Sequence, residues 1–434
     1  MKDTSFEMVQ MGNVRLHVYS TDKFKTHTLM AMIPQELSSH NVTRTALLPS
    51  LLLRGNSAYP DTLSFRRKLE DLYGATLTGS VFKRGEKHIL RFRMELADSK
   101  YLHGADSLLE DGIRFLGEVL MNPLVEDEGF RPSYIEAEKK NLRQKIVGLV
   151  DDKIRYAYQR MIACMCEGEP YSLYNHGRLE DLEELNSHNM YDYYQELLAT
   201  RPLDLFFVGN IDVDELVGLI EKHFPHDENP RNSVELGSVI HPVTQIKTVV
   251  EEQKVNQGKL NIGCRTQTSV RDKEYVPLLM YNGILGSFPH SKLFVNVREK
   301  ASLAYYASSR LDNHKGILGI QTGIEISNYQ QAVDIIKQQL QAMTEGNISD
   351  EEIHKTKASL ANYFREQLDS PSGLIEFHYN GILGGVQRKI PDIIDEIYEV
   401  TREDIQNVAE KVQLDTIYFL RDEKEEVSNG TNRT

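Results

Sequence analysis

The hydrophobic and polar positions of this chain change between helical and strand-like spacing, which predicts a fold with both kinds of element. Residues 43–61, TRTALLPSLLLRGNSAYPD, combine an apolar run of helical length with a Gly turn and the start of a second helix. Strand-like segments flank two short charged turns, KRGEKH at 83–88 and LDNHKG at 311–316. Charged turns between such segments predict antiparallel hairpins.

The same order of elements occurs twice along the chain. From Ser64 and again from Ser291, the pattern predicts a helix, a break of small residues, two strands joined by a charged turn, and a long amphipathic helix. Acidic segments that begin a further charged helix come next, VEDEGF at 125–130 and ISDEEI at 348–353. The offset between the two passages stays at about 225 residues, and a constant offset indicates an internal repeat. Few identities align, so the prediction of two similar halves depends on order and spacing.

We therefore expect an α+β fold in which each half is an antiparallel sheet with helices packed on one face. Helices follow groups of strands instead of alternating with each strand, which favours this arrangement. The expected ranges are a first domain at 1–226, a linker at 227–245, a second domain at 246–421 and a disordered tail at 422–434. The linker is polar and contains two prolines, and the tail has almost no apolar residues.

Composition and charge exclude several classes of function. A formal charge of −14 over 434 residues argues against a nucleic-acid-binding surface, which needs clustered Lys and Arg. No apolar run approaches the roughly 20 residues that cross a bilayer, and the first residues lack the apolar core of a signal peptide. We therefore expect a cytoplasmic protein with no membrane partner. The three cysteines, Cys164, Cys166 and Cys264, lack metal-ligand spacing and are expected to be free thiols.

The most specific motif lies in the second half. The segment YNGILGSFPHSKLFVNVREKASLAYY at 281–306 resembles the M16 family of zinc metallopeptidases, which includes insulinase, pitrilysin and mitochondrial processing peptidase. The family pattern is a Gly-containing turn, an Arg-Glu helix end, and then Leu and Tyr entering a strand. Four residues match it at the family spacing: Arg298, Glu299, Leu303 and Tyr305. Ser302 stands where Gly is usual. The resemblance covers nearly the whole chain and implies the M16/LuxS-like metallohydrolase fold.

Active members of that family carry an inverted zinc motif, H-x-x-E-H, in the first half. An apolar triplet, a basic residue and a Gly follow the motif, and LLLRG at 51–55 supplies all of these. In this register the two His positions fall on Ala46 and Ser50, and the Glu position falls on Pro49. A methyl group and a hydroxyl do not replace imidazole as zinc ligands, and proline has no side-chain base to activate water. We therefore expect no metal in this chain and no peptidase activity from the chain alone.

Other candidate ligands do not complete a metal site. The resemblance places the remaining ligand on the helix FRPSYIEAEKKNLRQKI, at Lys145 in the best register, with Glu136 and Glu138 as alternatives. His223 and His226, in KHFPHDEN, form a short-spaced pair that we expect in a surface turn. The sequence contains no H-E-x-x-H, G-x-S-x-G or P-loop pattern.

Arg298 and Tyr305 have a structural and a functional interpretation. An Arg near a helix end can satisfy carbonyl groups, and Tyr is common in sheets. The resemblance implies instead that both residues bind substrate. The forked guanidinium would hold backbone carbonyls of a peptide, and the Tyr hydroxyl would donate a hydrogen bond to the oxyanion at the scissile carbonyl.

Two hypotheses of function follow. In the first, the chain is a catalytically inactive M16-type subunit that supplies Arg298 and Tyr305 to a heterodimer. The partner is a similar-sized M16-type subunit with an intact H-x-x-E-H that holds the zinc, and the substrate is an unfolded peptide or small protein. In the second, the chain is a stand-alone peptide-binding or scaffold protein on a degenerate peptidase fold, without proteolysis. No constellation of residues supports a third interpretation, a homodimeric enzyme with an unrelated active site.

Overall fold

The computed structural model describes residues 5–224, 227, 229, 231, 237 and 239–423. Much of the expected linker, including His226, and most of the expected disordered tail lie outside these residues. The contacts divide the chain into two compact units, each built from separate stretches of sequence. The first comprises residues 1–148, 173–237 and 363–392, and the second comprises residues 149–172, 238–362 and 393–434. The sequence predicted two continuous halves. Instead, the first unit includes residues 363–392 of the second half, and the second unit includes residues 149–172 of the first half.

The first unit contains a six-stranded sheet with the strand order β1-β2-β8-β3-β5-β4. These strands are β1 (Glu7–Met11), β2 (Val14–Ser20), β3 (Thr26–Glu36), β4 (Thr76–Arg84), β5 (Lys87–Ala97) and β8 (Leu203–Gly209). The strands β6 (Val125–Glu126) and β7 (Gly129–Phe130) form a separate small hairpin. The helices of this unit are α1 (Val42–Leu52), α2 (Thr62–Asp71), α3 (Leu108–Met121), α4 (Pro132–Val147), α6 (Ser187–Thr200), α7 (Val213–His223) and α11 (Pro371–Gly384).

The second unit contains a five-stranded sheet with the strand order β11-β12-β10-β13-β9. These strands are β9 (Lys247–Glu252), β10 (Gly258–Arg265), β11 (Ala304–Asp312), β12 (Ile317–Ile324) and β13 (Gln413–Arg421). Its helices are α5 (Lys153–Met165), α8 (Tyr275–Asn282), α9 (Tyr329–Thr344) and α13 (Arg402–Ala409). Two helices, α10 (Asp350–Gln367) and α12 (Ile390–Glu399), contain residues of both units.

The α+β class and the two similar halves are confirmed, and both expected hairpins are present as β4–β5 and β11–β12. The sheets are not purely antiparallel, however, because β2 pairs with β8 and β9 pairs with β13 in parallel. A tight charged turn fixes the direction of the two strands that it joins. It carries no information about strands that reach the sheet after a long helical connection, so these parallel pairs were not predictable from the turns.

In addition to the helices expected on one face, each sheet has a helix on its second face. Every residue of β8 is buried, so both of its faces are covered. On one face Phe207 joins the main core of α1, α3, α6 and α7. On the other, the Phe206 ring meets the Tyr379 ring of α11, with centroids 5.5 Å apart. A helix from residues 363–392 therefore covers the second face of the first sheet.

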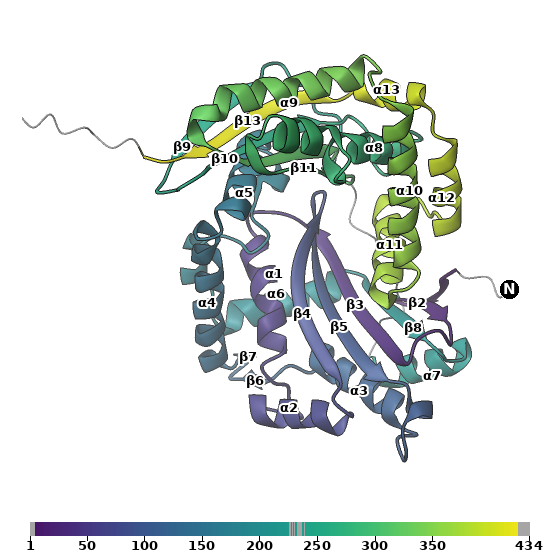
Figure 1. Ribbon diagram of the computed structural model, residues 1–434. Coiled ribbons are helices and arrows are strands. Elements are labelled where there is room, and N and C mark those ends of the chain that lie inside the picture. The colour runs from purple at the N-terminus through teal and green to yellow at the C-terminus, as the bar shows by residue number, and fades with distance from the viewer. Residues whose placement is uncertain are drawn as a thin grey trace, which may run out of the picture. The chain divides into compact units, whose positions relative to one another are not determined.

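The second sheet is covered in the corresponding way, with α9 along one face and α5 against the other (Figure 1). Phe419 of β13 packs on Tyr329 of α9, with ring centroids 4.6 Å apart. The next residue in the strand, Leu420, points to the opposite face and packs in one cluster with Met161 and Ile162 of α5. Alternation along β13 thus supplies an apolar surface to both helices.

Buried charges fix the segment that contains α5 to the second sheet. Glu169 follows α5, and its carboxylate binds Arg265 Nη2 at 2.5 Å and Lys315 Nζ at 2.6 Å. Arg265 also pairs with Asp415 at 3.1 Å. Burial alone would raise the pKa of Glu169, but hydrogen bonds from Arg265 and Lys315 hold it below its usual value. The charged form of Glu169 is therefore the one that the folded state contains.

A second buried polar cluster joins α11 to the first sheet. Arg15 of β2 holds Asp204 of β8 through two hydrogen bonds of 2.5 and 2.7 Å. The ring of His17 lies 3.5 Å from the same carboxylate and 3.3 Å from His378 Nε2 of α11. Burial and the nearby His17 lower the pKa of His378 from 6.5 to about 4. His378 is therefore neutral in the folded protein at physiological pH.

We predict that this histidine makes the protein acid-sensitive. The unfolded chain binds a proton at His378 below about pH 6.5, whereas the folded chain does so only near pH 4, so stability is lost as the pH falls through this window. When the pH falls from about 7.5 to about 5, the unfolding free energy of His378→Phe should decrease by about 2 kcal/mol less than that of the wild type. Phenylalanine keeps an aromatic ring beside Phe6, whose ring centroid lies 4.3 Å from that of His378.

Urea unfolding at the two pH values measures this difference. His103→Phe is the matched control, because His103 is exposed, and it should keep the pH dependence of the wild type. An unchanged pH dependence in His378→Phe would contradict the prediction.

Candidate functional site

Helix α1 carries the three positions at which the family resemblance expects zinc chemistry. Ala46 and Pro49 are buried, and Ser50 is exposed. Pro49 lies inside the helix and removes one backbone N–H from its ladder. In Figure 1, α1 runs beside β4 of the same unit. At this contact a Cβ added to Gly79 would come within 2.9 Å of the Pro49 Cβ. The position of a general base is therefore filled by a proline ring packed on the strand.

Fixed polar contacts hold α1 at its N-terminal half. Thr43 Oγ1 donates to Asp181 Oδ2 at 2.5 Å. The hydroxyls of Thr45 and Tyr193 lie 2.7 Å apart, and Tyr193 donates to Gln35 Oε1 at 2.8 Å. Thr45, Tyr193 and Gln35 are all buried, so the helix is tied to β3 and α6 by a satisfied internal network. These contacts give α1 a structural role that needs no metal.

At the other end of α1, an ion pair neutralises the one buried carboxylate of α4. Glu138 Oε1 lies 2.6 Å from Arg54 Nε, and Glu138 Oε2 accepts a hydrogen bond from Asn141 at 3.0 Å. Glu136 and Lys145, the other two candidates on this helix, are exposed. Which of the three corresponds to the family's ligand stays a prediction of the alignment.

These side chains do not fit a zinc ion. The α1 positions present a methyl group, a proline ring and one hydroxyl, and the nearest buried acid is already bound by a guanidinium. Over the described residues as a whole, no group of three or more His, Cys, Asp and Glu side chains could hold a metal. His223 binds Glu110 at 3.0 Å, and its expected neighbour His226 is outside the described residues.

The second candidate segment connects α8 to β11 and has an unusual backbone. Two π-helical turns, η5 (Gly283–Ser287) and η6 (Phe294–Lys300), replace an ordinary helix. Arg298 lies in η6, is exposed, and stacks its guanidinium 4.5 Å from the Phe294 ring centroid. π-Helical turns cost hydrogen-bond geometry and are found frequently at functional sites.

Two further irregularities lie between Arg298 and the strand. Ser302 has φ +53°, the left-handed conformation that glycine adopts most readily. This explains why a Gly is usual at this position of the motif. Tyr305 occupies a register shift of β11, since Ala304 pairs with Ile324 while Tyr306 pairs with Gly323. Such a bulge turns a side chain out of the regular alternation, and Tyr305 is 70% exposed.

The structure thus places Arg298 and Tyr305 at the two ends of one short, ordered connection. A backbone hydrogen bond from Leu303 N to Val297 O, 3.1 Å long, closes this connection. Both side chains are exposed, and no other described residue makes a hydrogen bond or ion pair with either head group. A guanidinium and a phenol in this state can donate hydrogen bonds to a ligand.

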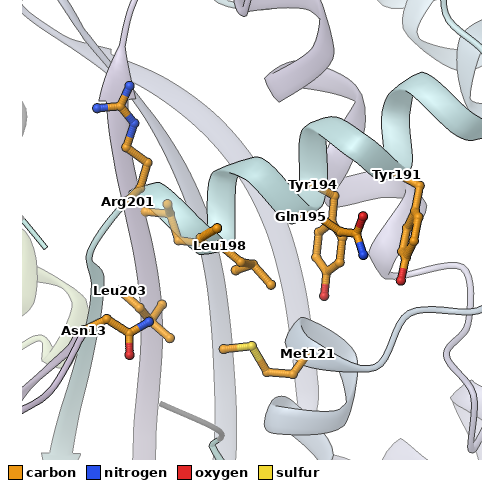
Figure 2. A pocket seen from close by; sticks show the side chains of 10 residues that line it. Asn13, Met121, Tyr191, Tyr194, Gln195, Leu198, Arg201 and Leu203 are labelled. Carbon is orange, nitrogen blue, oxygen red and sulfur yellow. The ribbon is translucent and has the colours of Figure 1, made fainter. Parts of the chain in front are cut away.

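A hollow of about 370 Å³ is present elsewhere in the first unit, along α6 (Figure 2). Figure 2 shows Tyr191, Tyr194 and Leu198 on one side of the helix, toward Met121, while Arg201 extends away from them. No acid, histidine or cysteine is among the described residues that line it. The hollow therefore offers neither metal ligands nor an acid–base pair.

Sequence reasoning missed the pairing of Arg54 with Glu138. Both residues were visible, one in LLLRG and the other as a possible ligand, but nothing in the sequence joins positions so far apart.

In the part of the chain that the structure describes, no helix combines the length and the apolar character needed to cross a membrane.

We predict that Arg54→Met destabilises the protein by about 3 kcal/mol, because it leaves the Glu138 carboxylate buried without its partner. The double variant Arg54→Met/Glu138→Gln should recover most of this loss. Arg143→Met is the matched control, since its ion pair with Glu183 is exposed and should contribute less than about 1 kcal/mol. Chemical unfolding of the four proteins provides the measurement, and equal losses in Arg54→Met and the double variant would refute the explanation.

We also predict that Ser302→Gly stabilises the protein by about 0.5 kcal/mol. Glycine relieves the left-handed backbone, and this gain exceeds both its larger loss of chain entropy and the loss of the exposed hydrogen bond to Glu299 O. Ser302→Ala keeps the strain and loses the 3.2 Å hydrogen bond to Glu299 O, so it should destabilise. Thermal unfolding compares the two variants, and the same direction of change in both would rule out backbone strain as the cause.

Comparison with known proteins agrees with these observations. A family model described as the peptidase M16 inactive domain matches residues 184–360. The probable inactive metalloprotease YmfF of Bacillus subtilis is 41% identical over 410 residues, which cover 94% of this chain and 96% of YmfF. The crystal structure of a conserved protein from Enterococcus faecalis superposes with a TM-score of 0.89 at 32% identity, covering 97% of this chain and 99% of that one.

A more distant relative is the probable mitochondrial-processing peptidase subunit beta of Schizosaccharomyces pombe, which is 22% identical over 329 residues, 72% of this chain and 70% of the relative. The extent of the match to YmfF, the family model and the absence of ligands at the α1 positions lead to one conclusion. The chain belongs to the M16 peptidase family and is one of its inactive metalloprotease homologues.

Proposed function

We propose that this inactive homologue is the non-catalytic subunit of a heterodimeric M16 peptidase, and that Arg298 and Tyr305 bind the peptide substrate. The observation that carries the proposal is the connection from η6 to β11. It combines a π-helical turn, a left-handed Ser302 and a bulge at Tyr305, and it leaves both head groups exposed. Strained backbone persists where the surrounding structure holds it, and such strain clusters at ligand-binding sites.

The proposed partner is an M16-type chain with an intact H-x-x-E-H, and any zinc of the complex belongs to that partner. The residues of α1 support this division, since they fit no metal and are held by internal contacts. A distant relative named as a peptidase subunit is compatible with an assembly of unlike chains.

The two side chains would act on the substrate directly. The fork of Arg298 donates hydrogen bonds to backbone carbonyl oxygens and thus holds an extended or unfolded peptide. The Tyr305 hydroxyl donates to the carbonyl oxygen under attack and stabilises the negative charge that develops there. A cytoplasmic location is part of the same proposal, and the three free cysteines are compatible with a reducing compartment.

A stand-alone peptide-binding protein is the second candidate. The observation that favours it is the dense packing around Pro49, which stabilises the fold without reference to any catalytic partner. Both candidates use the same peptide contacts, so they differ only in whether cleavage follows binding.

The test is an assay of fluorogenic peptide cleavage by the chain alone, by the H-x-x-E-H homologue alone, and by the two together. We expect the chain alone to be inert and the mixture to be active. Arg298→Ala and Tyr305→Phe should each lower kcat/KM of the mixture about 100-fold, because each removes a donor that acts in the transition state.

Lys300→Ala is the matched control, since Lys300 is an exposed cation of the same turn, and it should leave kcat/KM unchanged. Chelator-sensitive cleavage by the chain alone would overturn the proposal. If the mixture is fully active with either variant, Arg298 and Tyr305 have no role in substrate binding. If the chain binds peptides but does not change their cleavage by the homologue, the second candidate is favoured.

A further inference from the structure

The row of residues beside Tyr305 has features that the proposed role of Arg298 and Tyr305 does not use. Tyr306 of β11, Gly323 of β12 and Lys259 of β10 are paired directly across three neighbouring strands. Residues in register on adjacent strands point to the same face of a sheet. Gly323 contributes no side chain, so its backbone forms a floor on which the neighbouring side chains lie.

The side chains close over this floor from both sides. A Cβ placed on Gly323 would come within 2.6 Å of Tyr306 Cε1 and 2.9 Å of Gln257 Oε1. The Lys259 ammonium lies 5.9 Å from the centre of the Tyr306 ring and donates to Gln257 Oε1 at 2.6 Å. Three polar groups therefore meet above one glycine.

Lys259, Gln257 and Tyr306 contain no carboxylate themselves, and the nearby charge is that of Asp152, which acts on Tyr306. Lys259 is partly buried, and no carboxylate of the described residues pairs with its ammonium. Its pKa is lowered, and burial is the cause. A partly buried ammonium without a counter-ion is unfavourable, and an arriving anion would relieve that cost.

The neighbours of Lys259 are also rich in donors. Gln257 Nε2 is buried and has no hydrogen-bond partner among the described residues. Burial, and to a smaller extent the charge of Asp152, raise the pKa of Tyr306 to about 12, so its hydroxyl stays protonated and can donate. An acceptor with a negative charge is the chemical group that would satisfy this arrangement.

We propose that Lys259 and Tyr306 form a subsite for a carboxylate of the bound peptide. This inference rests on the proposed function, because it extends the peptide site from Tyr305 to the next residue of β11 and across the sheet to β10. The carboxylate comes either from the C-terminus of the peptide or from an Asp or Glu side chain. The subsite would make carboxylate-bearing peptides the preferred ligands.

Fluorescence anisotropy with the full-length chain tests this preference. The probes are labelled peptides of equal length and neutral sequence that differ in one group only. One has a free C-terminus, the second has an amidated C-terminus, and a further amidated pair carries Glu or Gln at an internal position. We expect at least one carboxylate peptide to bind about tenfold more tightly than its uncharged counterpart. The pair that shows the difference identifies the source of the carboxylate.

Variants assign the preference to the subsite. Lys259→Met should abolish the difference between the charged and uncharged peptides, and Lys259→Arg should retain most of it. Tyr306→Phe should weaken only the carboxylate peptide, by several-fold. Lys254→Met is the matched control, because Lys254 is an exposed lysine close to the same strand, and it should behave as the wild type.

The outcomes separate this inference from the proposed function. Arg298→Ala should weaken all peptides equally, whereas Lys259→Met should weaken only those with the preferred carboxylate. Peptide binding without any carboxylate preference, or an equal loss for all peptides in Lys259→Met, would overturn the subsite and leave the proposed function standing. A chain that binds none of the peptides would overturn both.

Discussion

The inner strands of both sheets are buried on both faces, and this imposes the main constraint on the molecule. A sheet whose strands carry apolar side chains on both faces is stable only when other elements pack against both faces. Here α11 covers Phe206 on the first sheet, and α5 covers Leu420 on the second. Each covering helix comes from the opposite half of the sequence, so neither continuous half contains all the helices of its own unit. Glu169 joins the segment of α5 to the buried Arg265 and Lys315, and the cluster of Arg15, Asp204 and His17 reaches α11 through His378.

In this inactive homologue, helix α1 has structural contacts at the positions where the family motif would have zinc chemistry. A zinc helix must leave ligand side chains and an open coordination position accessible. In this chain Pro49 fills the space against Gly79, and Arg54 supplies a fixed positive charge to Glu138. The helix packs against β4, α4 and α6. The irregular backbone lies at the η6–β11 connection, where Arg298 and Tyr305 are exposed.

The sequence predicts those features whose causes are local. The turns at 83–88 and 311–316 fix two hairpins, and the repeated order of elements indicates two similar halves. The departure at Ser302 also has a local meaning, which the positive φ makes explicit. Parallel pairing and the exchange of covering helices depend on segments far apart in the sequence, and no short pattern encodes them. The role of Lys259 could not be predicted for the same reason, because it depends on Gly323 and Tyr306 of two other strands.

The exchange of helices also sets the order in which the chain can complete its fold as it leaves the ribosome. All strands of the first sheet have been made once β8 ends at Gly209, but α11 does not begin until Pro371. Until then the apolar face around Phe206 and the buried acid Asp204 have no helix over them. A long interval with an uncovered sheet face exposes a nascent protein to aggregation, so chaperones that hold apolar surfaces have a defined target during synthesis. The first sheet therefore receives its second covering layer only after most of the chain has been made.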